Sequence, residues 1–364
     1  MKYLTFGRIL LLTIMILPET SLYAQNKTIY AGSDFPQLPD KIGFAAMYAG
    51  TINGKVIAAG GANFLDKMPW DGGAKSFSDA IYVFKPEVGE WKKQTQKLPH
   101  KMAYGVSVSY GSGMILAGGC TEGNKNIKEV LLLREKDGAL SIKQLAAMPV
   151  ALANMCGDLV GDYLFIAGGS EDAAGLPTQN FLAYDIKGDR WQLLENIPGP
   201  ARINAVSASS AGIFYLFTGI QLSQTSEGIQ RKVLTDAYSF FPKYLGGKLV
   251  GGAWKKLADM PRGMAAGPSP APVVNGKHIV LFGGLDQETA QYTDPKTHPG
   301  FLPDVFQYNL SSNTWEPAGR LPKQEVRLTV PTVIYHGQCL LINGEIGPGA
   351  RTNKIYAIDL KHSK

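Results

Sequence analysis

The sequence has few of the residues that metal centres, disulfide frameworks and nucleic-acid surfaces need. Its 364 residues include 3 cysteines and 5 histidines, and only 18% are charged. Three cysteines allow at most one disulfide, and we expect Cys120, Cys156 and Cys339 to be buried in strands or at strand ends. The net charge of +6 comes without clustered Lys/Arg runs. We therefore expect no nucleic-acid partner, no metal and no other cofactor, and the basic excess at most favours anionic small ligands.

Long apolar segments are also missing beyond the N-terminus. No later segment reaches the roughly 18 apolar residues of a membrane-spanning helix, so no stable membrane anchor is expected. At the N-terminus, Lys2 and Arg8 precede a short apolar run, Ile9 to Leu17, which is followed by small and polar residues up to Ala24. This order is typical of a secretory signal peptide. We predict a signal peptide over residues 1–24, export to the periplasm and a mature chain of residues 25–364.

Glycine, in contrast, is abundant, with 42 residues, and it is placed periodically. Six apolar segments end in glycine: VIAAGG at Gly61, MILAGG at Gly119, LFIAGG at Gly169, FYLFTG at Gly219, HIVLFGG at Gly284 and CLLING at Gly344. A second marker has the same period: Leu38-Pro39, Leu98-Pro99, Met148-Pro149, Ile197-Pro198, Met260-Pro261 and Leu321-Pro322. Two independent markers, each found six times, identify an internal repeat.

Each repeat reads as four strands. A strand of small residues comes first, then the glycine-ended strand, a tyrosine-bearing strand such as AIYVFKP, and usually a tryptophan-bearing strand. This order resembles the kelch repeat, in which one repeat makes one blade of a β-propeller. The predicted fold is therefore an all-β, six-bladed propeller over residues 25–364. The last repeat stops after its third strand, KIYAIDL, and the mature N-terminus supplies an extra strand, so we expect the two to pair and close the ring.

In such a blade, the loop after the second strand and the loop after the fourth strand lie on the same face. Arg202, Arg262 and Arg351 then come from three blades to one rim and are candidates for a common pocket. An arginine after the repeat's proline also bonds loop carbonyls in many blades, so Arg202 and Arg262 keep that alternative. The long loop ANFLDKMPWDGGAKSF is either a lid or a packed surface loop. His298 and Tyr292 in another long loop fit either proton transfer or an ordinary polar loop.

Glu345 differs because the repeat provides its own control. The residues after the glycine in the other five units are Ala62, Cys120, Ser170, Ile220 and Leu285. No structural role shared by the six units requires a carboxylate there. Arg351 follows six residues later across IGPGA, in which Gly347 and Gly349 permit unusual φ and Pro348 stiffens the turn. The pair is therefore predicted either to act on a ligand or only to shape its loop.

The segment INGEIGPGART resembles the hallmark of the sialic acid mutarotase family, also called N-acetylneuraminate epimerases: Asn-Gly-Glu, two residues, Pro-Gly, one residue, Arg-Thr. The segment AGGANFLDKMPWDGGAKSFSDAIYVF is similar to the family's Gly-Gly loop with a long insert. With the six repeats, the resemblance covers the whole mature chain. The Asn-Gly-Glu blade comes last here, whereas in the family it lies nearer the middle, so the chain resembles a cyclically permuted branch. Moving the chain ends around a closed ring preserves the geometry of the rim.

The resemblance implies a secreted enzyme that interconverts the anomers of N-acetylneuraminate without a cofactor. It implies that Glu345 is the acid/base and that Arg351 binds the substrate, and we add Arg202, Arg262 and Asn343 as candidate substrate contacts. The alternative is a non-catalytic periplasmic propeller that binds glycans or proteins, because a fold alone does not give function. A copper radical oxidase of the galactose-oxidase type is disfavoured, because the five histidines show no convincing ligand set.

Overall fold

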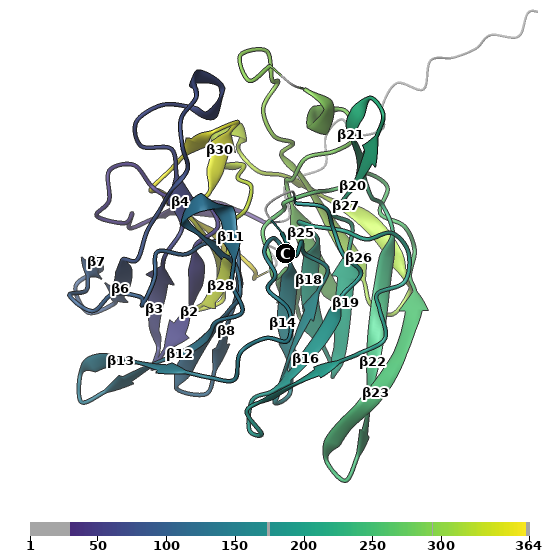
Figure 1. The fold of residues 1–364 in the computed structure, drawn as a ribbon, viewed down its shortest axis with the longest axis horizontal. Helices are drawn as coiled ribbons and strands as arrows, with labels where there is room; N and C mark the ends of the chain where they lie inside the picture. Colours follow the sequence, from purple (N-terminus) through teal and green to yellow (C-terminus); the bar gives the residue numbers. More distant parts are fainter. Residues whose placement is uncertain (1–29, 173–174, 293, 362–364) are drawn as a thin grey trace, which may run out of the picture.

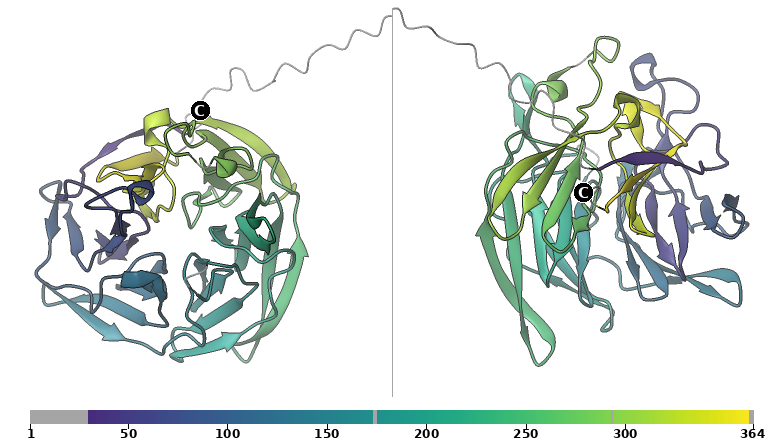
Figure 2. Two further views of the ribbon diagram at one scale, coloured as in Figure 1. Left: turned by 45° about the horizontal axis from the view of Figure 1, so that its top comes forward. Right: turned by 180° about the vertical axis from the view of Figure 1, so that it is seen from behind.

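The computed structural model describes residues 30–172, 175–292 and 294–361, and it is built from strands, with no α-helix in those ranges. Six four-stranded antiparallel sheets, the blades, surround a central axis (Figures 1 and 2). The prediction of an all-β, six-bladed propeller is therefore confirmed. The predicted signal peptide lies outside the described residues. Within them, no helix has the length and apolar character needed to cross a bilayer.

The blades follow one another along the chain. Blade 1 contains β2 (Tyr48–Ile52), β3 (Lys55–Ala59), β6 (Ile81–Lys85) and β7 (Glu90–Lys93). Blade 2 contains β8 (Val106–Tyr110), β9 (Gly113–Ala117), β12 (Val130–Lys136) and β13 (Ala139–Gln144). Blade 3 contains β14 (Cys156–Val160), β15 (Tyr163–Ala167), β16 (Phe181–Asp185) and β17 (Arg190–Leu193).

The second half repeats this arrangement. Blade 4 contains β18 (Val206–Ser210), β19 (Ile213–Phe217), β22 (Ala237–Leu245) and β23 (Lys248–Lys256). Blade 5 contains β24 (Val273–Val274), β25 (His278–Phe282), β26 (Asp304–Asn309) and β27 (Thr314–Arg320). Blade 6 contains β28 (Thr332–Tyr335), β29 (Gln338–Ile342), β32 (Ile355–Asp359) and β1 (Gly32–Phe35), so its outer strand comes from the N-terminal part of the chain. In that pairing, Gly32 lies opposite Ile358 and Phe35 opposite Ile355.

Short elements decorate the rim of the ring. Four two-stranded hairpins follow the second strands of blades 1, 2, 4 and 6: β4 (Ala62–Asn63) with β5 (Ser76–Phe77), β10 (Cys120–Thr121) with β11 (Lys125–Asn126), β20 (Ile220–Thr225) with β21 (Gly228–Val233), and β30 (Glu345–Gly347) with β31 (Ala350–Arg351). The 3₁₀ turns are η1 (Pro69–Asp71), η2 (Glu122–Asn124), η3 (Thr289–Gln291) and η4 (Lys323–Glu325). Figure 1 shows β4, β11, β20 and β30 along the upper side, so the post-glycine loops share one face as expected.

The core lies between neighbouring blades. Between blades 3 and 4, for example, Phe165, Phe181, Phe214 and Phe240 pack together, with Trp254 against them. The tryptophans of other blades also tie adjacent units, because their indole N–H groups donate to carbonyls of the preceding blade or its connection: Trp91 to Pro36, Trp191 to Ala146 and Trp315 to Ala258. Large aromatic rings supply area while these polar ends remain paired. The three cysteines are buried, as predicted, and all three are free thiols.

Candidate active site

The six post-glycine residues occupy equivalent backbone positions. Each forms an isolated antiparallel bridge with a residue at the entry to its own blade: Ala45 with Ala62, Ala103 with Cys120, Ala153 with Ser170, Ile203 with Ile220, Ala265 with Leu285 and Leu328 with Glu345. In blade 6, Leu328 and Glu345 exchange both backbone hydrogen bonds, at 2.9 and 3.0 Å. Because the other five blades make the same bridge with an uncharged residue, the backbone does not require the carboxylate of Glu345.

A short hairpin sets the carboxylate of Glu345 beside a guanidinium. Glu345 on β30 lies directly opposite Arg351 on β31, with Nη2 of Arg351 3.3 Å from Oε2 of Glu345. The backbone N–H of Gly349 donates to Oε1 of Glu345 at 3.0 Å. Gly349 has φ +72°, a left-handed conformation that glycine adopts without steric cost. The glycines that the sequence places between the two charged residues therefore allow the turn that brings them together.

Arg351 is buried but only partly satisfied. Its side chain is 4% exposed and that of Glu345 is 20% exposed. Nε and Nη1 of Arg351 have no hydrogen-bond partner among the described residues. The guanidinium carbon lies 5.3 Å from the centre of the Phe64 ring, which contributes a cation–π contact and holds the planar group in place. Since an unpaired buried donor is costly, the two free nitrogens favour a bound acceptor, and a carboxylate has the matching geometry.

The long loop of blade 1 packs on this hairpin. It leaves the ring at β4 and returns at β5, and Trp70 in η1 lies against Gly349, with ring atoms 3.0 Å from where a Cβ of Gly349 would be. Trp70 remains 41% exposed. Figure 1 shows the loop standing above β4, next to β30. The loop therefore contributes Phe64 and Trp70 to the surroundings of Glu345 and Arg351. Its role as a lid stays a prediction.

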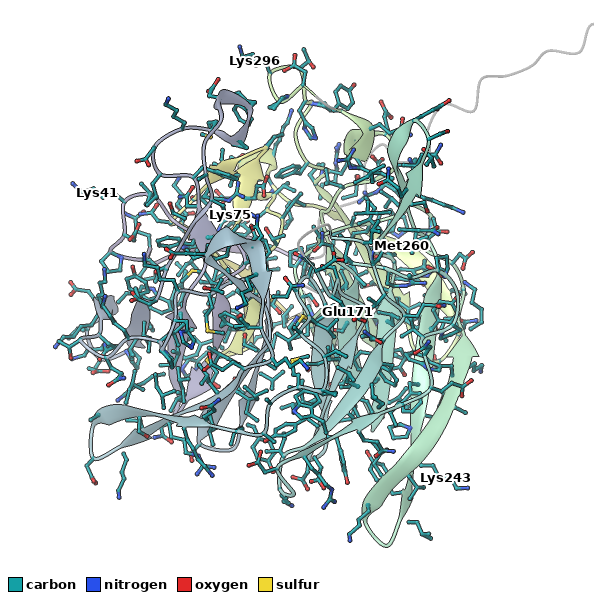
Figure 3. All side chains as sticks on the ribbon, viewed as in Figure 1. Lys41, Lys75, Glu171, Lys243, Met260 and Lys296 are labelled. Carbon is teal, nitrogen blue, oxygen red and sulfur yellow. The ribbon has the colours of Figure 1, made fainter. Side chains whose placement is uncertain are left out.

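Burial raises the pKa of Glu345 above its ordinary value, whereas Arg351, the Gly349 N–H, Lys75 and His298 act in the opposite direction. Nδ1 of His298 accepts a hydrogen bond from the Gly300 N–H at 3.0 Å, so a neutral His298 carries its proton on Nε2. The sequence predicts no role for Lys75, and its position in the long loop of blade 1 is the only feature that places it near the site. In Figure 3, Lys75 lies inside the rim, whereas Lys296 lies at the tip of its loop.

Arg202 and Arg262 serve their own blades. Arg202 is fully buried, forms two hydrogen bonds with Asp236 at 2.8 and 2.7 Å, and donates to the Thr218 carbonyl at 2.8 Å. Arg262 donates in the same way to the Gly283 carbonyl at 3.0 Å. Arg327 repeats the pattern in blade 6, where it contacts the Asn343 carbonyl at 3.5 Å and pairs with Glu325. The structure therefore supports the alternative of carbonyl binding for these arginines and does not bring Arg202 to Glu345.

Asn343 is also part of the scaffold. It is fully buried, with φ +59°, and it takes the place that the first glycine of the Gly-Gly pair has in blade 1, where Gly60 has φ +66°. Asparagine tolerates this left-handed conformation better than most residues. Its amide fits between the Phe44 N–H at 3.3 Å and the Asn353 carbonyl at 3.2 Å. Asn343 thus lies beneath the hairpin, and its amide bonds to the surrounding backbone.

The described residues contain no group of three or more His, Cys, Asp or Glu side chains placed to hold a metal ion. The site consists instead of a carboxylate, a partly satisfied guanidinium, two nearby cationic or ionisable side chains and aromatic walls. Such a set can bind an anionic ligand and exchange a proton with it.

Known proteins are similar to this chain. Residues 33–142 match the profile of a family described as N-acetylneuraminate epimerase. A protein of that name from Haemophilus influenzae (strain PittEE) is 26% identical over 228 residues, which cover 56% of this chain and 56% of the relative. One from Yersinia enterocolitica is 27% identical over 233 residues (57% and 56%), and one from Yersinia pestis (strain Pestoides F) is 27% identical over 240 residues (59% and 57%).

These matches have a limited extent. The chain spans about half the length of the curated relatives it matches. The family profile covers the long loop of blade 1 but ends before the hairpin of Glu345 and Arg351. The resemblance to this family is nevertheless confirmed by independent comparisons of sequence. The chain is similar to the N-acetylneuraminate epimerases.

Proposed function

We propose that the protein interconverts the α and β anomers of N-acetylneuraminate by acid/base ring opening and reclosure. One observation carries the proposal. Among the six described blades, only blade 6 has an acid, Glu345, directly after the glycine. Glu345 pairs with Arg351, which keeps two buried donors without a partner among the described residues. The name of the relatives, N-acetylneuraminate epimerase, supports the choice of sugar.

Arg351 is proposed to bind the substrate. Its Nε and Nη1 are available to donate two parallel hydrogen bonds to the carboxylate of the sugar acid, while Nη2 stays near Glu345. A guanidinium does not exchange protons at physiological pH, so Arg351 contributes charge and orientation. Phe64 behind the guanidinium and the hairpin around it limit its movement.

Glu345 is proposed to move the proton. The ionised carboxylate takes the proton of the anomeric hydroxyl, the bond from the anomeric carbon to the ring oxygen breaks, and a carbonyl forms. The protonated Glu345 returns that proton to the ring oxygen, so charge and atoms balance. Rotation of the open chain presents the other carbonyl face, and the same steps in reverse close the ring as the other anomer. A carboxyl pKa raised by burial is better matched to this exchange than an ordinary one.

The proposal includes export to the periplasm, which the order of charged, apolar and small residues at the N-terminus supports. A periplasmic enzyme of this kind would meet its sugar outside the cytoplasm. A fusion of residues 1–24 to a reporter enzyme that is active only after export tests this part independently of catalysis.

The test of the activity follows the anomeric signals of freshly dissolved N-acetylneuraminate by proton NMR, with and without protein. The parent should accelerate equilibration. Glu345→Gln keeps the size and the hydrogen bonding of the side chain but cannot take a proton, so the rate should fall about 100-fold or more while the β-rich fold and much of the affinity remain. Glu122→Gln, an exposed acid on another rim loop, is the matched control and should behave as the parent.

Two outcomes would contradict the proposal. Catalysis near the parental rate in Glu345→Gln would make Glu345 structural. A parent that binds the sugar without accelerating equilibration would make the protein a non-catalytic glycan-binding propeller.

A further inference from the structure

Six residues form a closed collar at the mouth of the central channel. Each directly follows the bridge residue at the entry to its blade: Ala46, Tyr104, Asn154, Asn204, Ala266 and Thr329. All six have left-handed backbones, with φ of 53°, 65°, 58°, 53°, 56° and 49° in that order. The collar therefore repeats one unusual backbone conformation once per blade, whatever the side chain.

The backbone of the collar is fully paired with itself. Each N–H donates to the carbonyl of the collar residue in the preceding blade: Ala46 to Thr329, Tyr104 to Ala46, Asn154 to Tyr104, Asn204 to Asn154, Ala266 to Asn204 and Thr329 to Ala266, at 2.8 to 3.1 Å. These six bonds close a cycle around the axis. Since the cycle uses the backbone alone, it leaves the collar side chains free for another purpose.

The side chains of the collar are not dictated by its geometry. Asparagine is favoured in left-handed conformations, but Ala46 and Ala266 show that the collar forms without an amide. The two alanines belong to blades 1 and 5, which flank blade 6, whereas Asn154 and Asn204 belong to blades 3 and 4. The collar side chains are thus small in the two blades next to blade 6 and polar in blades 3 and 4, on the opposite side of the ring.

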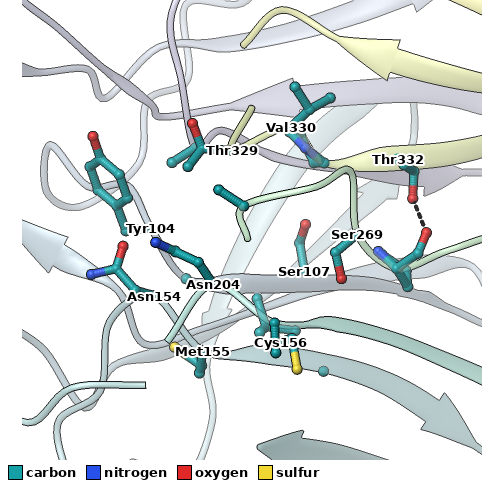
Figure 4. Close-up of a pocket in the computed structure, with 18 of the residues that line it drawn as sticks. Tyr104, Ser107, Asn154, Met155, Cys156, Asn204, Ser269, Thr329, Val330 and Thr332 are labelled. Atoms are coloured by element: carbon teal, nitrogen blue, oxygen red, sulfur yellow. Dashed lines mark hydrogen bonds between the residues drawn. The ribbon is translucent and has the colours of Figure 1, made fainter. Parts of the chain in front are cut away.

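The polar side chains have unused hydrogen-bonding capacity. Asn154 and Asn204 make no side-chain hydrogen bond to another described residue, and Thr329 Oγ1 is buried without a partner there. Figure 4 shows Tyr104, Asn154 and Asn204 gathered at one end of the cavity, with Ser107 and Ser269 at the other. An amide offers both a donor and an acceptor, so the two asparagines match a neutral polar ligand group that needs both.

The collar adjoins the site of Glu345 and Arg351. Thr329 follows Leu328, whose backbone pairs with Glu345. On the other side, the Lys75 ammonium lies 4.5 Å from the centre of the Tyr104 ring, and Lys75 is close enough to Glu345 to act on its ionisation. Two members of the collar, Tyr104 and Thr329, therefore lie on the side of the ring that carries the ion pair.

The collar residues line a cavity that continues along the axis past Ser107 and Ser269. The collar is the end of this cavity nearest the hairpin of blade 6, so it is the part that a ligand held by Arg351 on the rim would meet.

We propose that Asn154 and Asn204 bind the acetamido group of the sugar acid whose carboxylate is held by Arg351, with Tyr104 and Thr329 completing the polar part of the collar. This inference rests on the proposed function, since it assumes the same ligand. An acetamido group has one N–H and one C=O: the oxygen of one asparagine amide accepts from the N–H, and the NH2 of the other donates to the C=O. The collar would then distinguish N-acetylneuraminate from the same nine-carbon keto acid with a hydroxyl in place of the acetamido group.

The test compares Asn154→Ala and Asn204→Ala with the parent on these two sugars. Alanine already occupies the collar in blades 1 and 5, so both variants should fold, and thermal melting checks this. Each should raise KM for N-acetylneuraminate by about three- to tenfold, as expected for one lost neutral hydrogen bond, and leave kcat nearly unchanged. KM for the hydroxyl analogue should change less. Asn53→Ala, the same substitution at φ +49° in an exposed β2–β3 turn, is the control and should have no effect.

The outcomes separate this inference from the function on which it rests. If the parent is active and both variants keep its KM and its preference for the acetamido sugar, the collar site is wrong and the proposed function stands. Equal losses on both sugars overturn the acetamido assignment, because they indicate contact with hydroxyls. If the parent is inactive, binding of N-acetylneuraminate is measured by ligand-observed NMR instead. Weaker binding by the variants than by the parent supports the collar site. Equal binding by the parent and the variants, or no binding by the parent, rejects it.

Discussion

Nη2 of Arg351 lies 3.3 Å from Oε2 of Glu345, and the guanidinium makes no other polar contact among the described residues. A buried ion pair that only stabilised its hairpin would satisfy more of the donors of the arginine, as Arg202 does with Asp236 and two backbone carbonyls. The contrast between these two buried arginines is the basis for proposing Arg351, and not Arg202, as a ligand contact. It also identifies which substitutions should affect the ligand and which should affect the fold.

Arg351→Lys should weaken the binding of N-acetylneuraminate while leaving the fold intact. Lysine keeps the charge but loses the planar fork that the two free nitrogens of Arg351 provide. The loss of a charged hydrogen bond costs about 1.5 to 3 kcal/mol, or roughly ten- to a hundredfold in affinity. Titration calorimetry or the substrate dependence of mutarotation measures the change, with Arg231→Lys on the β20–β21 hairpin as control. Unchanged saturation would remove Arg351 from the site.

Glu345→Gln should change how stability depends on pH. Burial raises the pKa of Glu345 in the folded protein, whereas in the unfolded chain it stays near its ordinary value of 4.5. The folded state then binds the proton more tightly, so the parent loses stability relative to the variant as pH rises from the ordinary pKa through the raised one. Arg351, Lys75 and His298 oppose the raised pKa and reduce the size of this effect.

Urea unfolding of parent and variant at a series of pH values from about 4 to 7 gives the difference directly. A difference that does not vary with pH would show that burial does not perturb Glu345. The opposite slope, with the parent gaining on the variant as pH rises, would show that the Arg351 ion pair outweighs burial.

Arg202→Met should destabilise the protein without altering the ligand affinity of the folded fraction. The substitution leaves Asp236 without its bidentate partner, and breaking a buried pair costs about 3 to 5 kcal/mol. Denaturant unfolding measures the loss, and the double variant Arg202→Met with Asp236→Leu should recover part of it. Normal stability combined with a raised KM would instead return Arg202 to the list of ligand contacts.

Deleting residues 26–34 should cause aggregation or a large loss of stability. The deletion removes most of β1 and uncovers the edge of β32, whose unpaired backbone groups would then be open to other chains. It also removes Tyr30, which is 1% exposed and donates to Gln307 of blade 5 at 3.1 Å. Thermal melting and light scattering measure the effect, with Tyr30→Phe as a control for the single hydrogen bond. A truncated chain that melts as the full chain does would show that β1 is dispensable.

The sequence alone determined the repeat architecture, because the glycine-ended strands and the Pro-marked loops recur as a local, periodic signal. It also determined the pairing of Glu345 with Arg351. These residues are six positions apart, and the glycines between them permit the turn that a two-stranded hairpin needs. Short-range chemistry of this kind can be read from composition and spacing.

Only the tertiary structure decided the surroundings of the other candidate residues. Whether Arg202 faces a ligand depends on Asp236, which is distant in sequence, and on complete burial between strands. Asn343 matches a family motif, yet its left-handed backbone at the end of β29 turns the amide into the scaffold. The collar residues lie in six different repeats, and they meet only because the ring of blades brings their backbones together in one cycle of hydrogen bonds. No local pattern in the sequence encodes that convergence.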